Sequence, residues 1–188
     1  MNKLIYKNRV PHYIESVMMQ VFHITPFLEI LKKHRDFSRA IEIGTADGGF
    51  TNLLADYFTN VYTFDIKSKK INLYDHKNIQ QITANMHELN EIENKLLPII
   101  SQQGNNIIFI DGGDKAKEAN LISNYIKSND LILCHDFSID ANDFFNRGKM
   151  IWNCAECYEE FLNLKNLKRS ELFDIGLNFA WGTYERNF

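Results

Sequence analysis

Short runs of consecutive apolar residues alternate along the chain with segments whose apolar residues recur every three or four positions. Runs of the first kind are typical of buried strands, and segments of the second kind are typical of amphipathic helices. The predicted strands cover residues 39–43, 61–64, 79–84, 106–110 and 130–134. Strands that alternate with helices fold as a parallel sheet covered on both faces. The sequence therefore predicts a doubly wound, Rossmann-like α/β fold.

The two ends of the chain add elements to this sheet. An apolar stripe over residues 12–23 predicts one helix, and Thr25-Pro26 predicts the start of a second helix that runs to about Lys33, because proline is favoured in a first turn. The apolar spacing over residues 154–162 predicts a helix after the fifth strand. Within residues 172–186, a turn that contains Gly176 precedes an alternating pattern from Leu177 onward, so we expect an antiparallel hairpin there, with no helix.

The chain has 188 residues, the size of one domain, and we expect residues 1–35 to form a helical extension of it. The formal net charge of −3 provides no positive electrostatic field that would attract the phosphate backbone of a nucleic acid, so we expect no nucleic-acid partner. No run approaches the ~18 apolar residues of a membrane span, so we expect no membrane partner either. Three cysteines suit a reducing compartment, and we expect a cytoplasmic protein. The oligomeric state stays open, with a homodimer among the options.

A glycine-rich segment, Glu42-Ile43-Gly44-Thr45-Ala46-Asp47-Gly48-Gly49, joins the first strand to the first helix. Glycines let a ligand approach the backbone, and a helix N-terminus offers unpaired N–H groups. Asp65 ends the second strand, where a carboxylate can accept hydrogen bonds from the hydroxyls of an adenosine ribose. These residues predict a nucleoside-cofactor site, although a capped tight turn is the simpler interpretation of the glycines alone.

Three ionisable residues follow the next two strands along the chain. Asp111 ends the fourth strand, and His135-Asp136 ends the fifth. Because ligands bind outside the carboxyl ends of parallel strands, we expect all three to face the cofactor crevice and take part in catalysis. Two carboxylates and an imidazole can bind Mg²⁺ or Mn²⁺ or supply a general base, and they can also simply cap turns.

An acidic residue two positions before the first glycine is not part of the nicotinamide pattern. Glu42, Gly44 and Gly48 instead resemble the first motif of the class I S-adenosylmethionine-dependent methyltransferases. Ala46 replaces the middle glycine of that motif, as in catechol-type enzymes. The resemblance covers residues 25–188 and implies a seven-stranded sheet with an antiparallel seventh strand.

The resemblance implies a role for each matching residue. Glu42 would support the turn and the amino-acid end of the cofactor, and Asp65 would hold the ribose. Asn85 stands where a polar side chain normally reaches the adenine. The residues expected to contact the cofactor are Glu42, Gly44, Thr45, Gly48, Asp65, Asn85 and Asp111.

The residues after Ile108, with the later His-Asp pair, resemble the catechol-type and cephalosporin-hydroxylase-like subgroup of these enzymes. In that subgroup, acids at the positions of Asp111 and Asp136 bind a divalent cation. Phe137 stands at the position of the third ligand, and the base is left open among His135, Asp114 and Lys115.

The expected function is methyl transfer from S-adenosylmethionine to an oxygen nucleophile of a small molecule, with a sugar hydroxyl as one candidate and Mg²⁺ or Mn²⁺ as a possible aid. The alternatives are a nicotinamide-dependent oxidoreductase and a non-catalytic nucleoside-binding domain of the same fold.

Overall fold

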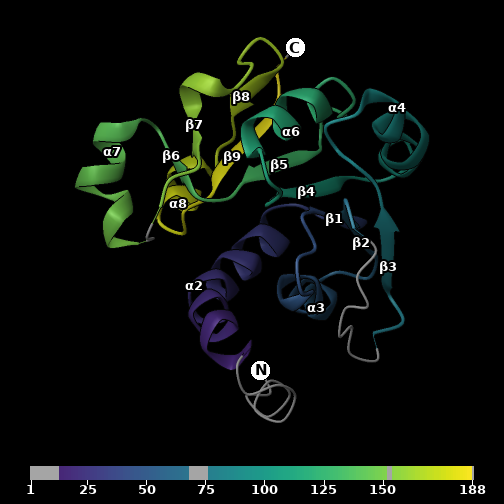
Figure 1. The fold of residues 1–188 in the computed structure, drawn as a ribbon, viewed down its shortest axis with the longest axis horizontal. Helices are drawn as coiled ribbons and strands as arrows, with labels where there is room; N and C mark the ends of the chain where they lie inside the picture. Colours follow the sequence, from purple (N-terminus) through teal and green to yellow (C-terminus); the bar gives the residue numbers. More distant parts are fainter. Residues whose placement is uncertain (1–12, 68–75, 152–153, 188) are drawn as a thin grey trace.

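The computed structural model describes residues 13–67, 76–151 and 154–187, with side chains from residue 24 onward. A seven-stranded sheet runs through the described residues in the order β3-β2-β1-β4-β5-β9-β8 (Figure 1). Its strands are β1 (Arg39–Ile43), β2 (Val61–Asp65), β3 (Ile79–Thr83), β4 (Asn106–Ile110), β5 (Leu131–Cys134), β8 (Leu167–Arg169) and β9 (Gly182–Arg186). Strands β1 to β5 are parallel, and β9 pairs antiparallel with both β5 and β8. The predicted sheet, with its antiparallel C-terminal hairpin, is confirmed.

The register places the carboxyl ends of the parallel strands at one edge of the sheet. Ile43 of β1 pairs with Phe64 of β2 and with Ile110 of β4, and Ile110 pairs with Cys134 of β5. The loops that follow these strands therefore begin side by side, as expected for the ligand edge of a doubly wound sheet.

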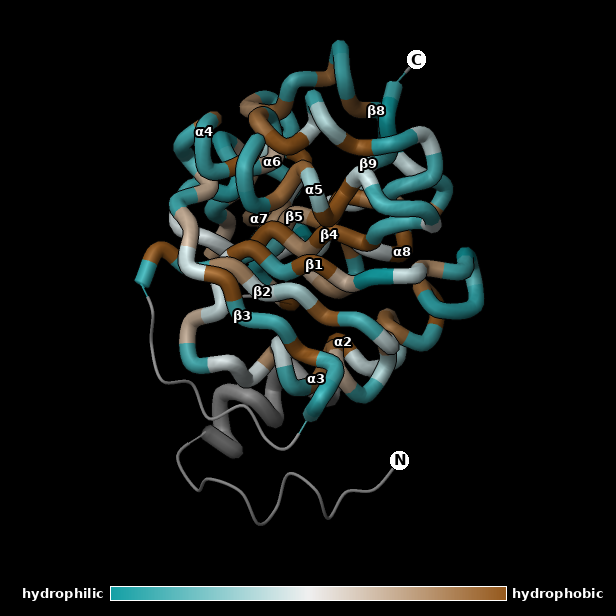
Figure 2. Tube along the Cα trace, turned by 90° about the vertical axis from the view of Figure 1, so that its right-hand side faces the viewer, coloured by the Kyte–Doolittle hydropathy of each residue, from teal (hydrophilic) through white to brown (hydrophobic). Residues whose placement is uncertain are grey.

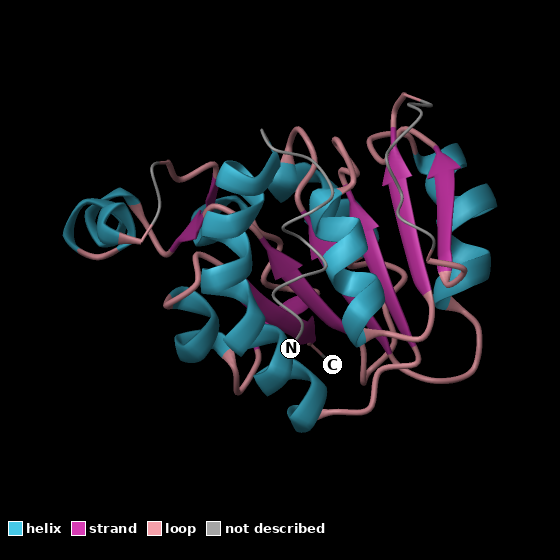
Figure 3. Ribbon diagram, turned by 90° about the horizontal axis from the view of Figure 1, so that it is seen from below, coloured by secondary structure: helices cyan, strands magenta, loops and turns pink. Residues whose placement is uncertain are grey.

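Helices cover both faces of the sheet (Figure 3). Helices α2 (Tyr13–His34) and α3 (Gly49–Tyr57) belong to one face. The other face carries α4 (Leu89–Glu91), η1 (Ile92–Leu96), α5 (Leu97–Ile100) and α6 (Lys115–Ile122). Within β4, Ile107 and Phe109 pack on the first face and Ile108 and Ile110 on the second. Both faces are buried, and Figure 2 shows hydrophobic residues gathered along the central strands.

The N-terminal segment differs from its prediction, because α2 is one continuous helix with Pro26 inside it. Ile24, Phe27, Leu28 and Leu31 are buried at helical spacing against the same core cluster. This burial on both sides of Pro26 outweighs the backbone hydrogen bond that an internal proline removes. Residues 1–12 of the predicted extension lie outside the described residues.

The predicted helix over residues 154–162 is also wrong. Strand β7 (Cys157–Tyr158) pairs with β6 (Phe137–Ser138) in a second small sheet, and η3 (Glu159–Phe161) follows as a single 3₁₀ turn. Cys157 is fully buried whereas Phe161 is 55% exposed. The apolar residues of this segment therefore do not share one face, which a helix would have required.

The C-terminal hairpin uses different residues from those expected. Its first strand is β8, and the connection to β9 contains the helix α8 (Phe173–Leu177). Phe173 and Leu177, four residues apart, are both buried. The alternating pattern from Leu177 onward predicted a strand, but only its last part, from Gly182, pairs in the sheet. Helix α7 (Ala141–Asn146) and η2 (Gly148–Met150) complete the described elements.

No helix in the described part of the chain combines the length and apolarity needed to cross a bilayer.

Candidate active site

The turn after β1 depends on two glycines in the left-handed region. Gly44 has φ of 98° and Gly48 has φ of 82°. The Gly44 N–H donates to the carbonyl oxygen of Phe64 at 2.8 Å, which ties the turn to the end of β2. A Cβ atom on Gly44 would overlap the backbone of Asp111. The first glycine is therefore required by both its conformation and its contact with the end of β4.

Glu42 and Thr45 support this turn from inside the protein. A carboxylate oxygen of Glu42 accepts hydrogen bonds from the hydroxyls of Thr51 at 2.5 Å and Thr63 at 2.6 Å. The Thr45 hydroxyl lies 2.6 Å from that of Thr63. Glu42 is 1% exposed, and its burial raises the pKa of its carboxyl to about 8. The hydrogen bonds of Glu42 and Thr45 thus connect β1, β2 and α3 to one another.

A cleft of about 410 Å³ opens at the carboxyl ends of the parallel strands. Gly44, Asp65, Asn85 and Asp111, four of the residues predicted to bind a cofactor, line it. The other three, Glu42, Thr45 and Gly48, do not. The structure therefore divides the predicted cofactor residues into a group at the cleft and a group that shapes the turn beside it.

Two backbone hydrogen bonds fix the carboxylate of Asp65. Its Oδ2 accepts from the Ala46 N–H at 3.1 Å, and its Oδ1 accepts from the Lys67 N–H at 3.0 Å. Each carboxylate oxygen has a further lone pair beyond the one used here. Asp65 is thus held in place while it keeps the capacity to accept two hydroxyl groups from a ligand in the cleft.

Sequence analysis missed an acid–imidazole pair in the cleft wall. Glu118 of α6 and His87, after β3, both line the cleft, and their Oε1 and Nε2 atoms lie 3.2 Å apart. Glu118 is 4% exposed, and burial raises the pKa of its carboxyl to about 7. The sequence carries no motif that singles out Glu118, because its place at the cleft depends on how α6 packs on the sheet.

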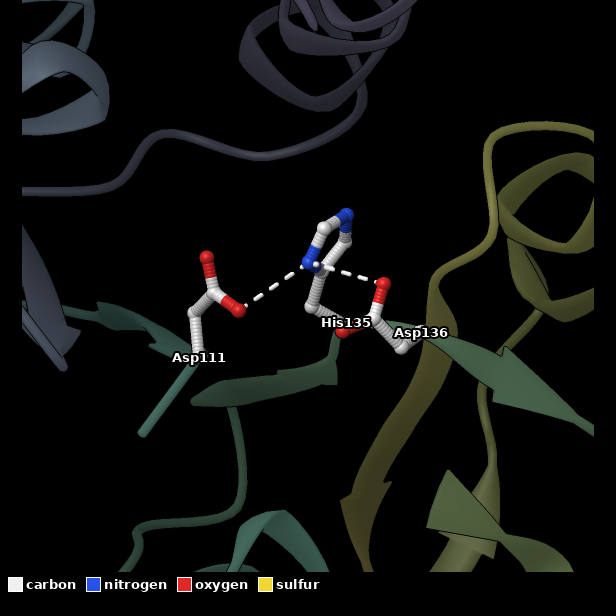
Figure 4. Close-up of side chains that lie close together, drawn as sticks. All are labelled: Asp111, His135 and Asp136. Carbon is white, nitrogen blue, oxygen red and sulfur yellow. Dashed lines mark hydrogen bonds and ion pairs between the residues drawn. The ribbon is translucent and has the colours of Figure 1, made fainter. Parts of the chain in front are cut away.

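Asp111, His135 and Asp136 lie close together (Figure 4), but of the three residues expected to face the cofactor crevice only Asp111 lines the described cleft. Nδ1 of His135 lies 3.0 Å from Oδ1 of Asp111 and 3.4 Å from Oδ1 of Asp136. Burial lowers the pKa of His135, but the hydrogen bond and charge of Asp111 and the charge of Asp136 outweigh it, and the pKa is raised. The imidazole is therefore held between two carboxylates that favour its protonated form.

Lys115, the first residue of α6, is the fourth member of this cluster. Its Nζ lies 3.1 Å from Oδ2 of Asp136 and 3.8 Å from Oδ1 of Asp111, and it is also ion-paired with Glu156. Burial lowers the pKa of Lys115, but Glu156 and Asp136 outweigh it and the pKa is raised. Asp114, the remaining candidate base, caps α6 by accepting the Lys117 N–H at 3.0 Å.

The donor atoms of Asp111, His135 and Asp136 lie within 4.8 Å of one another, which is close enough to share a cation. Carboxylates are suitable ligands for Mg²⁺ and Mn²⁺. However, the Lys115 ammonium already contacts both carboxylates, and Nδ1 of the imidazole faces the same two groups. The donors are of the right type, but their arrangement as described does not fit a resident divalent cation.

Comparison with known structures identifies the fold. The apo-structure of CmcI is 12% identical, with a TM-score of 0.59 over 92% of this chain and 71% of that chain. An S-adenosylmethionine-dependent methyltransferase from Anabaena variabilis is 14% identical, with a TM-score of 0.57 over 91% of this chain and 85% of that chain. A mutant of MtNAS in complex with S-adenosylmethionine is 14% identical, with a TM-score of 0.53 over 89% of this chain.

The chain spans 65% of the length of MtNAS, which is less than two thirds. No protein-family model matches the chain, and no curated protein matches it by sequence. At these low sequence identities the comparison shows a shared fold only, and all three structures share it with this chain. The chain has the class I methyltransferase fold, as the resemblance at Glu42, Gly44 and Gly48 implied.

Proposed function

We propose that the protein is an S-adenosylmethionine-dependent methyltransferase that acts on an oxygen nucleophile of a small molecule, with a sugar hydroxyl as one acceptor class. The observation that carries this proposal is the position of Asp65. Its carboxylate, fixed by two backbone N–H groups, lines a cleft beside the Gly44 turn, which lines the same cleft. In a class I methyltransferase fold, this pairing of an acid with a glycine turn suits an adenosine ribose.

The cleft is suited to the cofactor in size, polarity and charge. Its volume lies within the range of small-molecule sites. Asp65 would accept the ribose hydroxyls, and Asn85 offers both donor and acceptor groups to an adenine edge. Asp111, at the end nearest to His135, would place negative charge close to a cationic sulfonium. Glu42 and Thr45 would act indirectly, by supporting the turn.

The chemistry is an in-line displacement: a bond forms between the acceptor oxygen and the methyl carbon, the carbon–sulfur bond breaks, and the hydroxyl proton goes to a base. His135 is the residue that we propose as this base. Asp111 and Asp136 hold its Nδ1 side, which orients the ring and stabilises its protonated form. Alignment of the acceptor oxygen with the sulfonium methyl group would supply much of the remaining barrier reduction.

A ligand panel tests the cofactor assignment. Thermal unfolding should be measured with S-adenosylmethionine, S-adenosylhomocysteine, NAD and no ligand. Only the first two should raise the midpoint, since a ligand at a hundred times its Kd stabilises the folded state by about 2.7 kcal/mol. Stabilisation by NAD alone would favour an oxidoreductase instead. The acceptor class is then tested by incubating the loaded protein with sugars and phenols and looking by mass spectrometry for products that have gained one methyl group.

A further inference from the structure

The ammonium of Lys115 lies among three carboxylates that come from three separate segments. Asp111 follows β4, Asp136 follows β5, and Glu156 precedes β7. The side chains of Lys115 and Asp136 are 4% and 9% exposed, so this contact is buried, whereas Glu156 is 53% exposed and closes the cluster on the solvent side. A buried lysine is stable as a cation only where acids compensate its charge, and here three acids do so.

The same acids form the clusters that could bind a metal ion. One group consists of Asp111, His135 and Asp136, and a second consists of Asp136, Cys154 and Glu156. Asp136 belongs to both groups. Lys115 contacts a carboxylate from each group and contacts Asp136 itself. A single ammonium group therefore sits where the two clusters meet.

We propose that the ammonium of Lys115 takes the place of a divalent cation in this site, so that the native protein binds no resident Mg²⁺ or Mn²⁺ there. An ion bound to Oδ2 of Asp136 at the roughly 2.1 Å typical of Mg²⁺ would lie within roughly 5 Å of Nζ, which is 3.1 Å from the same oxygen. The repulsion between the two cations would oppose its binding. The ammonium of Lys115 thus supplies the positive charge that a metal ion would otherwise bring to these carboxylates.

The geometry of His135 supports the same conclusion. A histidine ligates a metal through a deprotonated ring nitrogen. Nδ1, the nitrogen in the cluster, instead lies at 3.0 Å and 3.4 Å from carboxylate oxygens of Asp111 and Asp136 (Figure 4). Nδ1 is hydrogen-bonded to Asp111 and lies within ion-pair distance of Asp136, so it is engaged with the acids. Oδ2 of Asp136 is thus engaged by Lys115 and Oδ1 of Asp111 by Nδ1 of His135, which leaves Oδ1 of Asp136 as a buried oxygen of these acids without a hydrogen-bond partner among the described residues.

Metal binding can be measured without any methyl acceptor, so the test is independent of the proposed function. Mn²⁺ should be titrated into wild type, Lys115→Ala, Lys115→Met and Lys117→Ala, and the free ion measured by electron paramagnetic resonance. Lys117 is an exposed lysine two residues along the same helix, which makes it the matched control. Asp136→Asn, alone and combined with Lys115→Ala, identifies binding at this site. Circular dichroism confirms that each variant is folded.

Wild type and Lys117→Ala should show no Mn²⁺ binding that depends on Asp136, so Asp136→Asn should not change the binding curve of wild type. Lys115→Ala, or Lys115→Met if the alanine variant does not fold, should bind one Mn²⁺. Its affinity should be at least about tenfold higher than that of any Mn²⁺ binding by wild type, because the acids are released from the ammonium. That gain should disappear when Asp136→Asn is added. A wild-type Mn²⁺ site that Asp136→Asn removes would overturn the proposal, and so would folded Lys115 variants that bind Mn²⁺ no better than wild type.

Discussion

Gly44 packs so closely on Asp111 that a Cβ atom on residue 44 would overlap the carbonyl oxygen of residue 111. The Asp111 N–H in turn donates to the carbonyl oxygen of Ile43 at 2.8 Å. The glycine turn after β1 and the acid after β4 are therefore a single packed unit. This contact brings the predicted cofactor turn and Asp111, one member of the predicted catalytic cluster, to the same cleft.

Gly44→Ala should destabilise the protein by about 2–4 kcal/mol, because alanine disfavours the φ of 98° and its methyl group meets backbone that cannot move away. Gly113→Ala is the matched control, since a Cβ on Gly113 has open space within 4 Å. Its free energy of unfolding should stay within about 0.5 kcal/mol of wild type. Urea unfolding measures both. Equal losses in the two variants would show that the contact with Asp111 is not what requires glycine.

The arrangement of the sheet was predictable because its pattern is strong and local. Consecutive apolar residues such as Ile107 to Ile110 are buried on both faces, which identifies central parallel strands. The errors fall where tertiary contacts decide the structure. Pro26 stays inside a helix because buried residues flank it, and residues 173–177 form a short helix within what looked like an alternating strand. Neither outcome is encoded in the local spacing.

Stability should depend on pH through Glu42. Burial raises the pKa of this carboxyl from 4.5 to about 8, so the folded state retains a proton that the unfolded state has lost. The corresponding stability is fully present below pH 4.5 and is lost as the pH rises toward and through about 8. Glu42→Gln cannot ionise at this position. The variant should therefore gain stability relative to wild type between pH 5 and pH 8.5, values chosen to span roughly this window.

Unfolding by urea at the two pH values checks this expectation. Glu88→Gln, which removes a carboxylate from an exposed position, is the control for a general loss of negative charge. If Glu42→Gln and Glu88→Gln change in parallel over the pH range, burial does not control the ionisation of Glu42.

His135→Gln should reduce kcat by about 10²–10⁴-fold, because the proposed base is lost while a side chain of similar length remains. Affinity for S-adenosylhomocysteine should change little, since His135 does not line the cleft that we assign to the cofactor. Steady-state kinetics with the acceptor found by the screen, together with calorimetry, separates the two effects. His76→Gln, at a partly exposed histidine that precedes the edge strand β3, controls for loss of an imidazole. Turnover that persists in His135→Gln would exclude His135 as the base.

The candidate site was predictable to the extent that it follows the strand ends. Asp65, Asp111, His135 and Asp136 each end a recognisable apolar run, and parallel topology brings such ends together. Lys115 was only one of three candidate bases, and Glu118 was not singled out at all. Both lie in the first turn of α6, whose start and rotation are set by packing against β4 and β5. Sequence spacing alone does not determine which side of that helix faces the cleft.

Calorimetric titration of S-adenosylhomocysteine into wild type, Asp65→Ala and Asp47→Ala tests the central claim most directly. Asp47 is an exposed acid in the same glycine turn and controls for loss of charge near the site. Wild type and Asp47→Ala should bind one ligand with similar affinity, and Asp65→Ala should bind more weakly by about 1.5–3 kcal/mol, through lost charge-assisted hydrogen bonds. No binding to folded wild type, or unchanged affinity in folded Asp65→Ala, would contradict the assignment of this cleft to the methyl donor.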